Sequence, residues 1–391
     1  MEEKQKKSKE CPHSSILDFN LSWVLLFVYL GYLLGIWFAQ RSTIANYIPS
    51  EYSGAPYFLV SIIGGVVLTF FIYNLGKIIF AKIAGYRVLY INLLGFIFDY
   101  SSGKLNFSYN IMSFFEVSMQ FTPKDDDVKK NPKLIFLGGY IAELLLIAIA
   151  LVIFFVLGPN GKTAKSAVAW TAMFMMSYGF LTPLYEILPF RQDYPTDMFN
   201  LLVVNTPDDK IAFNVVQINK RREIAGLDYM TYEFDSYESF YKSRVLLANY
   251  LDHLYASRLE KAFTVLESMR YYNKFYNDND RYIPAAETIY LRYLIDDDAG
   301  ADQQYLALKK DDKKEVATPK LLSDYRTAVL IAGYIALDKE KIVEIAGQFD
   351  KVIDSYGDEL SKRVLKEKEL FNSAYNKVRK AKPELSIPER A

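Results

Sequence analysis

The first half of the chain alternates long apolar runs with short polar connections. An α-helix needs about 20 mainly apolar residues to cross the hydrocarbon core of a bilayer. Runs that approach or exceed this length cover residues 21–39, 57–84, 134–157 and 167–190. A polar tail, residues 1–20, precedes them. We therefore predict a polytopic α-helical membrane domain over residues 21–205, with four transmembrane helices.

Between the second and third runs, residues 87–121 follow a different period. Leu105, Phe107 and Tyr109 alternate with polar residues, which is the pattern of a strand with one covered face. The stretch Asp99–Gly103 is a plausible turn before them. We expect a small membrane-proximal β-sheet here. An extended peptide could pair with its edge, although a purely structural sheet is the simpler interpretation.

The second half, residues 206–391, is charged and reads as a soluble all-α domain. Thr206 is a good helix start and Gly226 a good stop, and Asp235 with Glu238 suits a capping box for the next helix. Further helices are expected at Arg258–Phe275, Pro284–Asp298, from Thr318 onward, Asp338–Gly357 and Asp358–Ala381.

Successive helices of this length could form antiparallel pairs in a tetratricopeptide-like solenoid, which typically binds peptides or partner domains. An irregular helical bundle explains the same pattern equally well. In either arrangement, residues 206–391 are candidates for binding a cytosolic protein.

Composition excludes several classes of function. Lys plus Arg and Asp plus Glu both number 46, so no basic excess points to nucleic acid. The single cysteine, Cys11, cannot build a disulfide framework. The two histidines, His13 and His253, lie outside the apolar runs and far from other ligands at metal spacing, which argues against a histidine-based zinc site. No Walker phosphate loop is present, so the chain is not its own motor.

Polar residues near the end of the second run carry the main chemical signal, in the stretch Tyr73-Asn74-Leu75-Gly76-Lys77. Residues i and i+4 share a helix face, so two histidines at this spacing can hold zinc while a glutamate between them acts as base. The stretch resembles the His-Glu-x-x-His helix of the site-2 protease family of intramembrane zinc metalloproteases. Tyr73, Asn74 and Lys77 replace the two ligands and the base, and none of them can do that chemistry.

Two later segments extend the resemblance to about residues 57–205. Gly138-Gly139-Tyr140-Ile141-Ala142-Glu143 is similar to the Gly-Gly-Pro-x-Ala-Asn pattern of the family, with Tyr140 in place of proline and Glu143 in place of asparagine. The stretch from Glu186 to Met198 resembles the Asn-Leu-Leu-Pro segment and the following Asp-Gly. There, Asp197 matches the third zinc ligand of the family.

The resemblance implies a catalytically inactive relative that keeps the membrane core in which a transmembrane peptide is held, loses the metal and needs no cofactor. Such a protein would bind or present a membrane peptide or a membrane protein subunit. We expect the Lys77 ammonium to substitute for zinc and to pair with Asp197 within about 8 Å, the reach of one bridging water. Glu186 and Glu143 are the further members expected in this charge cluster.

Two other functions remain open at this stage. An active intramembrane metallopeptidase could use oxygen ligands from Glu143, Glu186, Asp193 and Asp197. Alternatively, the chain could be an accessory subunit of a membrane export complex.

The basic residues concentrate in the tail and in the loop at 85–133, whereas the loops at 40–56 and 158–166 carry few. By the positive-inside rule this predicts a multi-pass protein with both termini in the cytosol. A bacterial plasma membrane follows from the family resemblance and from the lack of eukaryotic sorting signals.

Overall fold

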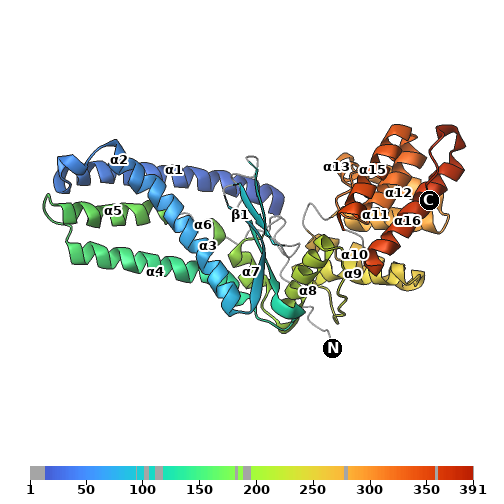
Figure 1. Cartoon of the computed structure of the whole chain (residues 1–391), viewed down its shortest axis with the longest axis horizontal. Coiled ribbons are helices and arrows are strands. Elements are labelled where there is room, and N and C mark those ends of the chain that lie inside the picture. Colours follow the sequence, from blue (N-terminus) through green and yellow to red (C-terminus); the bar gives the residue numbers. More distant parts are fainter. Residues whose placement is uncertain are drawn as a thin grey trace, which may run out of the picture. The chain divides into compact units, whose positions relative to one another are not determined.

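The computed structural model describes residues 14–93, 95–100, 105–110, 118–180, 184–187, 195–276, 281–356 and 360–390. The chain is mostly helical, with one small four-stranded antiparallel sheet (Figure 1). It divides into two compact units. Unit 1 comprises Met1–Val88 and Pro123–Lys210, and unit 2 comprises Leu89–Thr122 and Ile211–Ala391.

Unit 1 is built from long helices with short helical pieces at their ends. Its long helices are α1 (Ser14–Tyr47), α3 (Gly65–Ile83), α4 (Lys133–Leu157) and α5 (Ala164–Gly179). The short pieces are η1 (Ser50–Tyr52), α2 (Ala55–Leu59), the π-helical turn η2 (Val60–Gly64), η4 (Lys124–Asp126), α6 (Leu184–Ile187) and α7 (Asp197–Val203). Helix α3 packs against both α4 and α5, so it is the centre of the unit (Figure 1).

Two helices in the described part of the chain are long and apolar enough to cross a membrane, Val60–Ile83 and Lys133–Leu157. They coincide with the second and third predicted runs. The first predicted run lies within α1. The fourth, 167–190, is not one continuous helix, because α5 ends at Gly179 and α6 is a separate short helix.

Glycines allow α3 and α4 to pack backbone against backbone. A methyl group on Gly76 would overlap the carbonyl oxygen of Gly138 and would lie 2.5 Å from the Ala142 Cβ. A methyl group on Gly139 would lie 2.5 Å from the ring of Tyr73. Small residues at such crossings are the usual device for close helix packing in membranes. This crossing fixes Tyr73 directly against α4.

We expect Gly76→Ala to lower the free energy of unfolding of unit 1 by about 1–3 kcal/mol, because the added methyl group forces α3 and α4 apart. Gly35→Ala in α1 is the matched control, since nothing lies within 4 Å of its added methyl group. Denaturation in mixed micelles can be followed by tryptophan fluorescence, as Trp23, Trp37 and Trp170 all belong to unit 1. Equal losses in both variants would contradict the close packing.

The sheet confirms the strand pattern read from the sequence. Its strands are β1 (Tyr86–Leu93), β2 (Phe96–Asp99), β3 (Asn106–Tyr109) and β4 (Ser118–Pro123), in the spatial order β3-β2-β1-β4. Strand β1 pairs with β2 from Tyr90 opposite Asp99 to Leu93 opposite Phe96. Gly85, at φ +80°, makes the turn from α3 into β1. Part of the predicted turn, Ser101–Gly103, lies outside the described residues.

Unit 2 is mainly helical. Its helices are α8 (Pro207–Ile224, which includes the boundary between the units), α9 (Phe240–Tyr255), α10 (Leu259–Tyr271), α11 (Ile283–Leu294), α12 (Asp298–Ala307), α13 (Lys310–Ala317), α14 (Asp324–Ile331), α15 (Lys339–Ser355) and α16 (Lys362–Ala381). Neighbours in sequence pack on each other, as in the pairs α9 with α10, α11 with α12 and α14 with α15. Residues of α9 to α16 share one hydrophobic core. Membership of a repeat family stays a prediction.

Two details of the sequence-based helix boundaries are wrong. The cap of α9 is Ser239, whose hydroxyl accepts the Lys242 N–H at 3.2 Å, rather than the expected Asp235 and Glu238 pair. No helix begins at Thr318, because α13 ends just before it and α14 begins only at Asp324. The Asp324 carboxylate instead accepts backbone N–H groups of the connecting turn, at 2.8–2.9 Å.

A buried ionic network joins three helices of unit 2. Arg326 on α14 is fully buried and donates to Glu287 on α11 at 2.6 Å and to Glu367 on α16 at 3.0 Å. Tyr255 donates to the same Glu367 carboxylate at 2.6 Å, and the Tyr290 ring lies 4.2 Å from the Arg326 guanidinium carbon. Because each charge is paired at short range, the network can hold α11, α14 and α16 in one arrangement.

Unit 2 is expected to lose stability as the pH rises from about 5 to about 7. Burial raises the pKa of Glu287 to about 7, while Arg326 partly opposes this rise. Burial also raises the pKa of Glu223 and of Asp324. Since each folded-state pKa lies above the unfolded value, the folded state binds more protons in this window, and stability present below it is lost as the pH increases.

For Glu287 the expected loss is on the order of 1–3 kcal/mol. Hydrogen exchange of the α11 amides in the full chain, compared at pH 5 and pH 7.5 after correction for intrinsic rates, measures it. Glu287→Gln should flatten the profile, because the substituted amide does not titrate. A profile that rises with pH in the unmodified chain would show that the sign is wrong.

Candidate functional site

The site is a buried polar cluster where α3, α4, α6 and α7 meet. Tyr73 and Lys77 are four residues apart on α3 and so share one face. Tyr73 is only 4% exposed. Its ring lies over Gly139 and packs edge-on against Tyr140 of α4, with 5.5 Å between ring centres. Without a side chain at Gly139, the Tyr73 hydroxyl reaches past α4 toward α7.

The start of α7 holds the acidic member of the cluster. Asp197 is the first residue of this helix, and the preceding Thr196 caps it by accepting the Phe199 N–H at 3.4 Å. The Asn200 amide donates to the Pro195 carbonyl at 3.2 Å and ties the turn to the helix. The Asp197 backbone N–H donates to the Glu186 carboxylate at 2.8 Å. These contacts hold the backbone at Asp197 in place independently of its side chain.

The Asp197 carboxylate takes a donor on each oxygen. Lys77 Nζ lies 2.9 Å from Asp197 Oδ1, and the Tyr73 hydroxyl donates to Oδ2 at 2.7 Å. The side chains of Lys77 and Asp197 are 13% and 4% exposed. Lys77 Nζ also lies 5.8 Å from the centre of the Tyr73 ring. The structure therefore brings Asp197 into contact with Tyr73 and Lys77, although Asp197 lies 124 residues after Tyr73 in the sequence.

Because the Lys77–Asp197 ion pair is buried, breaking it should affect stability more than breaking an ion pair on the surface would. Taking a lysine and a carboxylate out of water costs several kcal/mol each, and only close contact with extra hydrogen bonds compensates for that cost. Both conditions hold here, since Tyr73 supplies the second donor to Asp197. Removing one partner would leave the other as an uncompensated charge.

Glu186 joins the cluster through the backbone rather than as a second direct partner of Lys77. Its carboxylate accepts the Asp197 N–H, and its own carbonyl accepts the Tyr140 hydroxyl at 2.6 Å. Tyr140 thus connects α4 to α6 and is part of the site, although the sequence marked it only as a replacement for proline. The signal available in the sequence was a tyrosine that directly follows Gly138 and Gly139 in an apolar run.

The other expected residues lie apart from the pair. The Asn74 side chain donates to the Phe70 carbonyl at 2.8 Å, one turn back on its own helix. Glu143 on α4 is buried, but among the described residues its Oε1 has no hydrogen-bond partner and the residue forms no ion pair with Lys77. The expected place of Glu143 in the charge cluster is therefore not observed. Asp193 lies outside the described residues.

The donor set does not suit a metal ion. Within the described residues, no three His, Cys, Asp or Glu side chains converge as ligands. Lys77 itself offers a cation with no free lone pair while it is protonated, so it cannot bind a metal ion in that state. Both oxygens of Asp197 already accept from Lys77 and Tyr73. Neither oxygen of Asp197 is therefore left without a donor that a metal ion could replace at no cost.

Comparison of the chain with protein-family models, curated proteins and solved structures gives no match. The resemblance to site-2 proteases consequently depends on the residues of the three motifs alone and stays a prediction.

Proposed function

We propose that the protein is a non-catalytic, site-2-protease-like membrane protein that binds or presents a membrane peptide or a partner subunit. The observation that carries this proposal is the Lys77–Asp197 contact of 2.9 Å. In the motif resemblance, Lys77 and Asp197 correspond to two of the residues that bind zinc in a protease of the family. Tyr73, which corresponds to a third zinc-binding residue in that resemblance, donates a hydrogen bond to Asp197.

The chemistry of peptide-bond hydrolysis is missing from these side chains. A zinc protease needs deprotonated ligands and a carboxylate that takes a proton from the bound water. The Asn74 amide does not act as that base, and it hydrogen-bonds to its own helix. The residues present do not fit a zinc ion, so the ion pair acts as a structural replacement that holds α3 against α7.

The apolar surface of unit 1 supports membrane placement. Long hydrophobic side chains on the outer faces of α3 and α4 are exposed, among them Phe71 at 53%, Phe155 at 74% and Val156 at 76%. Exposure of many large apolar side chains on two helices is unusual for a soluble protein and is expected where lipid covers the helices. We propose a multi-pass protein of a bacterial plasma membrane with both termini in the cytosol, in which Val60–Ile83 and Lys133–Leu157 cross the bilayer. Unit 2 would then offer a cytosolic surface to a partner protein.

The proposal predicts that a membrane peptide sits beside the ion pair and is not cut. A photocrosslinking amino acid can be placed at Met198 or Ile187, which are partly exposed neighbours of Asp197 and Glu186. The control position is Val152, which is 60% exposed and lies about 18 Å along α4 from Tyr140.

After irradiation in native membranes, we expect a discrete adduct from Met198 and Ile187, identified by mass spectrometry as an intact membrane-spanning segment. Val152 should give only diffuse lipid adducts. Cleaved client peptides, lost on Asp197→Asn, would instead support a metallopeptidase with unconventional ligands. Identical patterns at all three positions would contradict a binding role for this region.

A further inference from the structure

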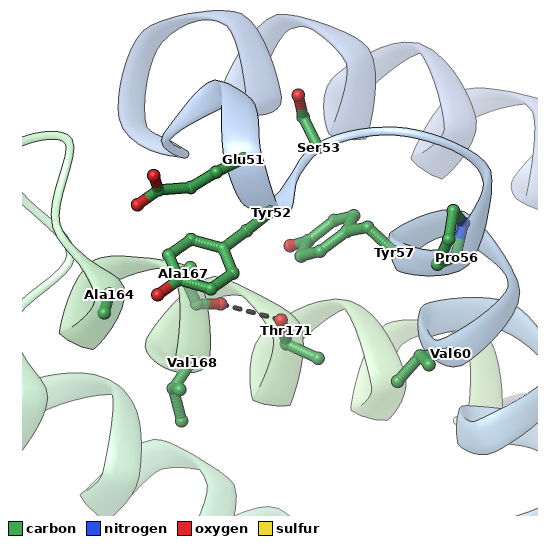
Figure 2. Close-up of a pocket in the computed structure, with 10 residues that line it drawn as sticks. All are labelled: Glu51, Tyr52, Ser53, Pro56, Tyr57, Val60, Ala164, Ala167, Val168 and Thr171. Carbon is green, nitrogen blue, oxygen red and sulfur yellow. Dashed lines mark hydrogen bonds between the residues drawn. The ribbon is translucent and has the colours of Figure 1, made fainter.

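Unit 1 contains a pocket lined by η1, α2, η2 and α5, none of which carries Lys77. It has a volume of about 490 Å³ and lies between the turn after α1, the start of α2 and the first turns of α5 (Figure 2). That volume is within the range of small-molecule sites, about 300–1,000 Å³. Its lining includes Glu51, Tyr52, Ser53, Tyr57, Val60 and Val168. None of these belongs to the polar cluster.

The polar side of the pocket is suited to a cation. Among the described residues of its lining, Glu51 is the only charged one, and no lysine, arginine or histidine is present. Tyr57 is 8% exposed, and its buried hydroxyl has no hydrogen-bond partner in the described part of the chain. Figure 2 shows Tyr57 extending across the pocket toward Tyr52, with the Glu51 carboxylate near the same end. The faces of two tyrosine rings and one carboxylate attract an ammonium group.

The other side of the pocket opens onto apolar surface. Val60 and Val168 line it and are both 54% exposed. Leu59 at the end of α2 and Ile63 in η2, which are 52% and 55% exposed, extend that surface. A ligand with a cationic head and an aliphatic body would therefore satisfy both sides at once. A purely polar ligand would leave the apolar wall uncovered.

We propose that this pocket binds the primary-ammonium headgroup of an aminophospholipid. Glu51 pairs with the ammonium group, and Tyr52 covers it with its ring. The Tyr57 hydroxyl donates to the phosphate, and the acyl chains follow the apolar face that includes Val60. The inference depends on the membrane placement proposed above, because only a protein in a bilayer meets this ligand at high concentration.

The test uses the full chain in mixed micelles that contain equal amounts of phosphatidylethanolamine and phosphatidylglycerol. Native mass spectrometry of the retained lipid should show a preference for phosphatidylethanolamine. Glu51→Gln should lower that preference about threefold to fivefold, the effect expected for one partly exposed ion pair. Tyr57→Phe should instead lower the retention of both lipids alike and leave their ratio unchanged, because both lipids carry the phosphate. Asp127→Asn is the matched control, an exposed carboxylate in another loop of unit 1, and should change nothing.

The outcomes separate this inference from the proposed function. Retained lipid with no headgroup preference, or a preference that survives Glu51→Gln, would overturn the inference and leave membrane placement intact. Retention of no lipid at all would overturn membrane placement itself. Displacement of the lipid by ethanolamine phosphate alone, or by a short peptide with a free amino terminus, would show that the pocket recognises a soluble amine and not a lipid.

Discussion

Lys77→Met is expected to lower the free energy of unfolding of unit 1 by about 3–5 kcal/mol, more than any other single substitution in the apolar helices. The variant keeps most of the side-chain volume and removes the charge. Asp197 would then be 4% exposed in its side chain with only the Tyr73 hydroxyl and no cation beside it. Lys82→Met is the matched control, an exposed lysine near the end of the same helix.

The double variant Lys77→Met with Asp197→Asn distinguishes a charge effect from a packing effect. Because removing both charges leaves no uncompensated ion, we expect it to recover at least about half of the loss, as measured by tryptophan fluorescence in mixed micelles. Additive losses in the double variant would show that the two side chains are not coupled. A Lys77→Met variant that behaves like Lys82→Met would show that the contact carries little energy.

Arg326→Leu is the second substitution with a large expected effect, again about 3–5 kcal/mol, this time in unit 2. It would leave Glu287 and Glu367 buried without their shared cation. Hydrogen exchange in the full chain should accelerate in α11, α14 and α16 together, since the guanidinium contacts all three helices.

The control for Arg326 is Arg258→Leu. Arg258 pairs with Asp252 at 3.4 Å, with both side chains about half exposed. Pairs of this kind contribute about 0–1 kcal/mol. Protection of α14 should therefore remain unchanged in this variant. Similar exchange in the two variants would contradict the importance given to the buried network.

The sequence predicted those features that depend on local pattern. Continuous apolar composition located α3 and α4, because an apolar run of membrane length is uncommon in soluble domains. The spacing of four residues placed Tyr73 and Lys77 on one face of α3. Period-two alternation indicated the strands of the sheet. In each case the information lies within one element.

Contacts between distant elements were harder to predict. Asp197 was chosen by its place in a motif, and no periodicity links it to Lys77. Glu186 joins the site by accepting a backbone N–H, which no residue pattern encodes. The Arg326 network was missed because its partners are about 40 residues away in the sequence. Glu143 was overestimated, since a shared motif does not fix the direction of a side chain.

The central claim is that a lysine ammonium occupies the position that a zinc ion would take. Zinc content per chain, measured by inductively coupled plasma mass spectrometry on full-length protein purified without chelators, tests it most directly. We predict zinc far below one ion per chain, with no change on Asp197→Asn. Stoichiometric zinc that is lost on Asp197→Asn would contradict this claim.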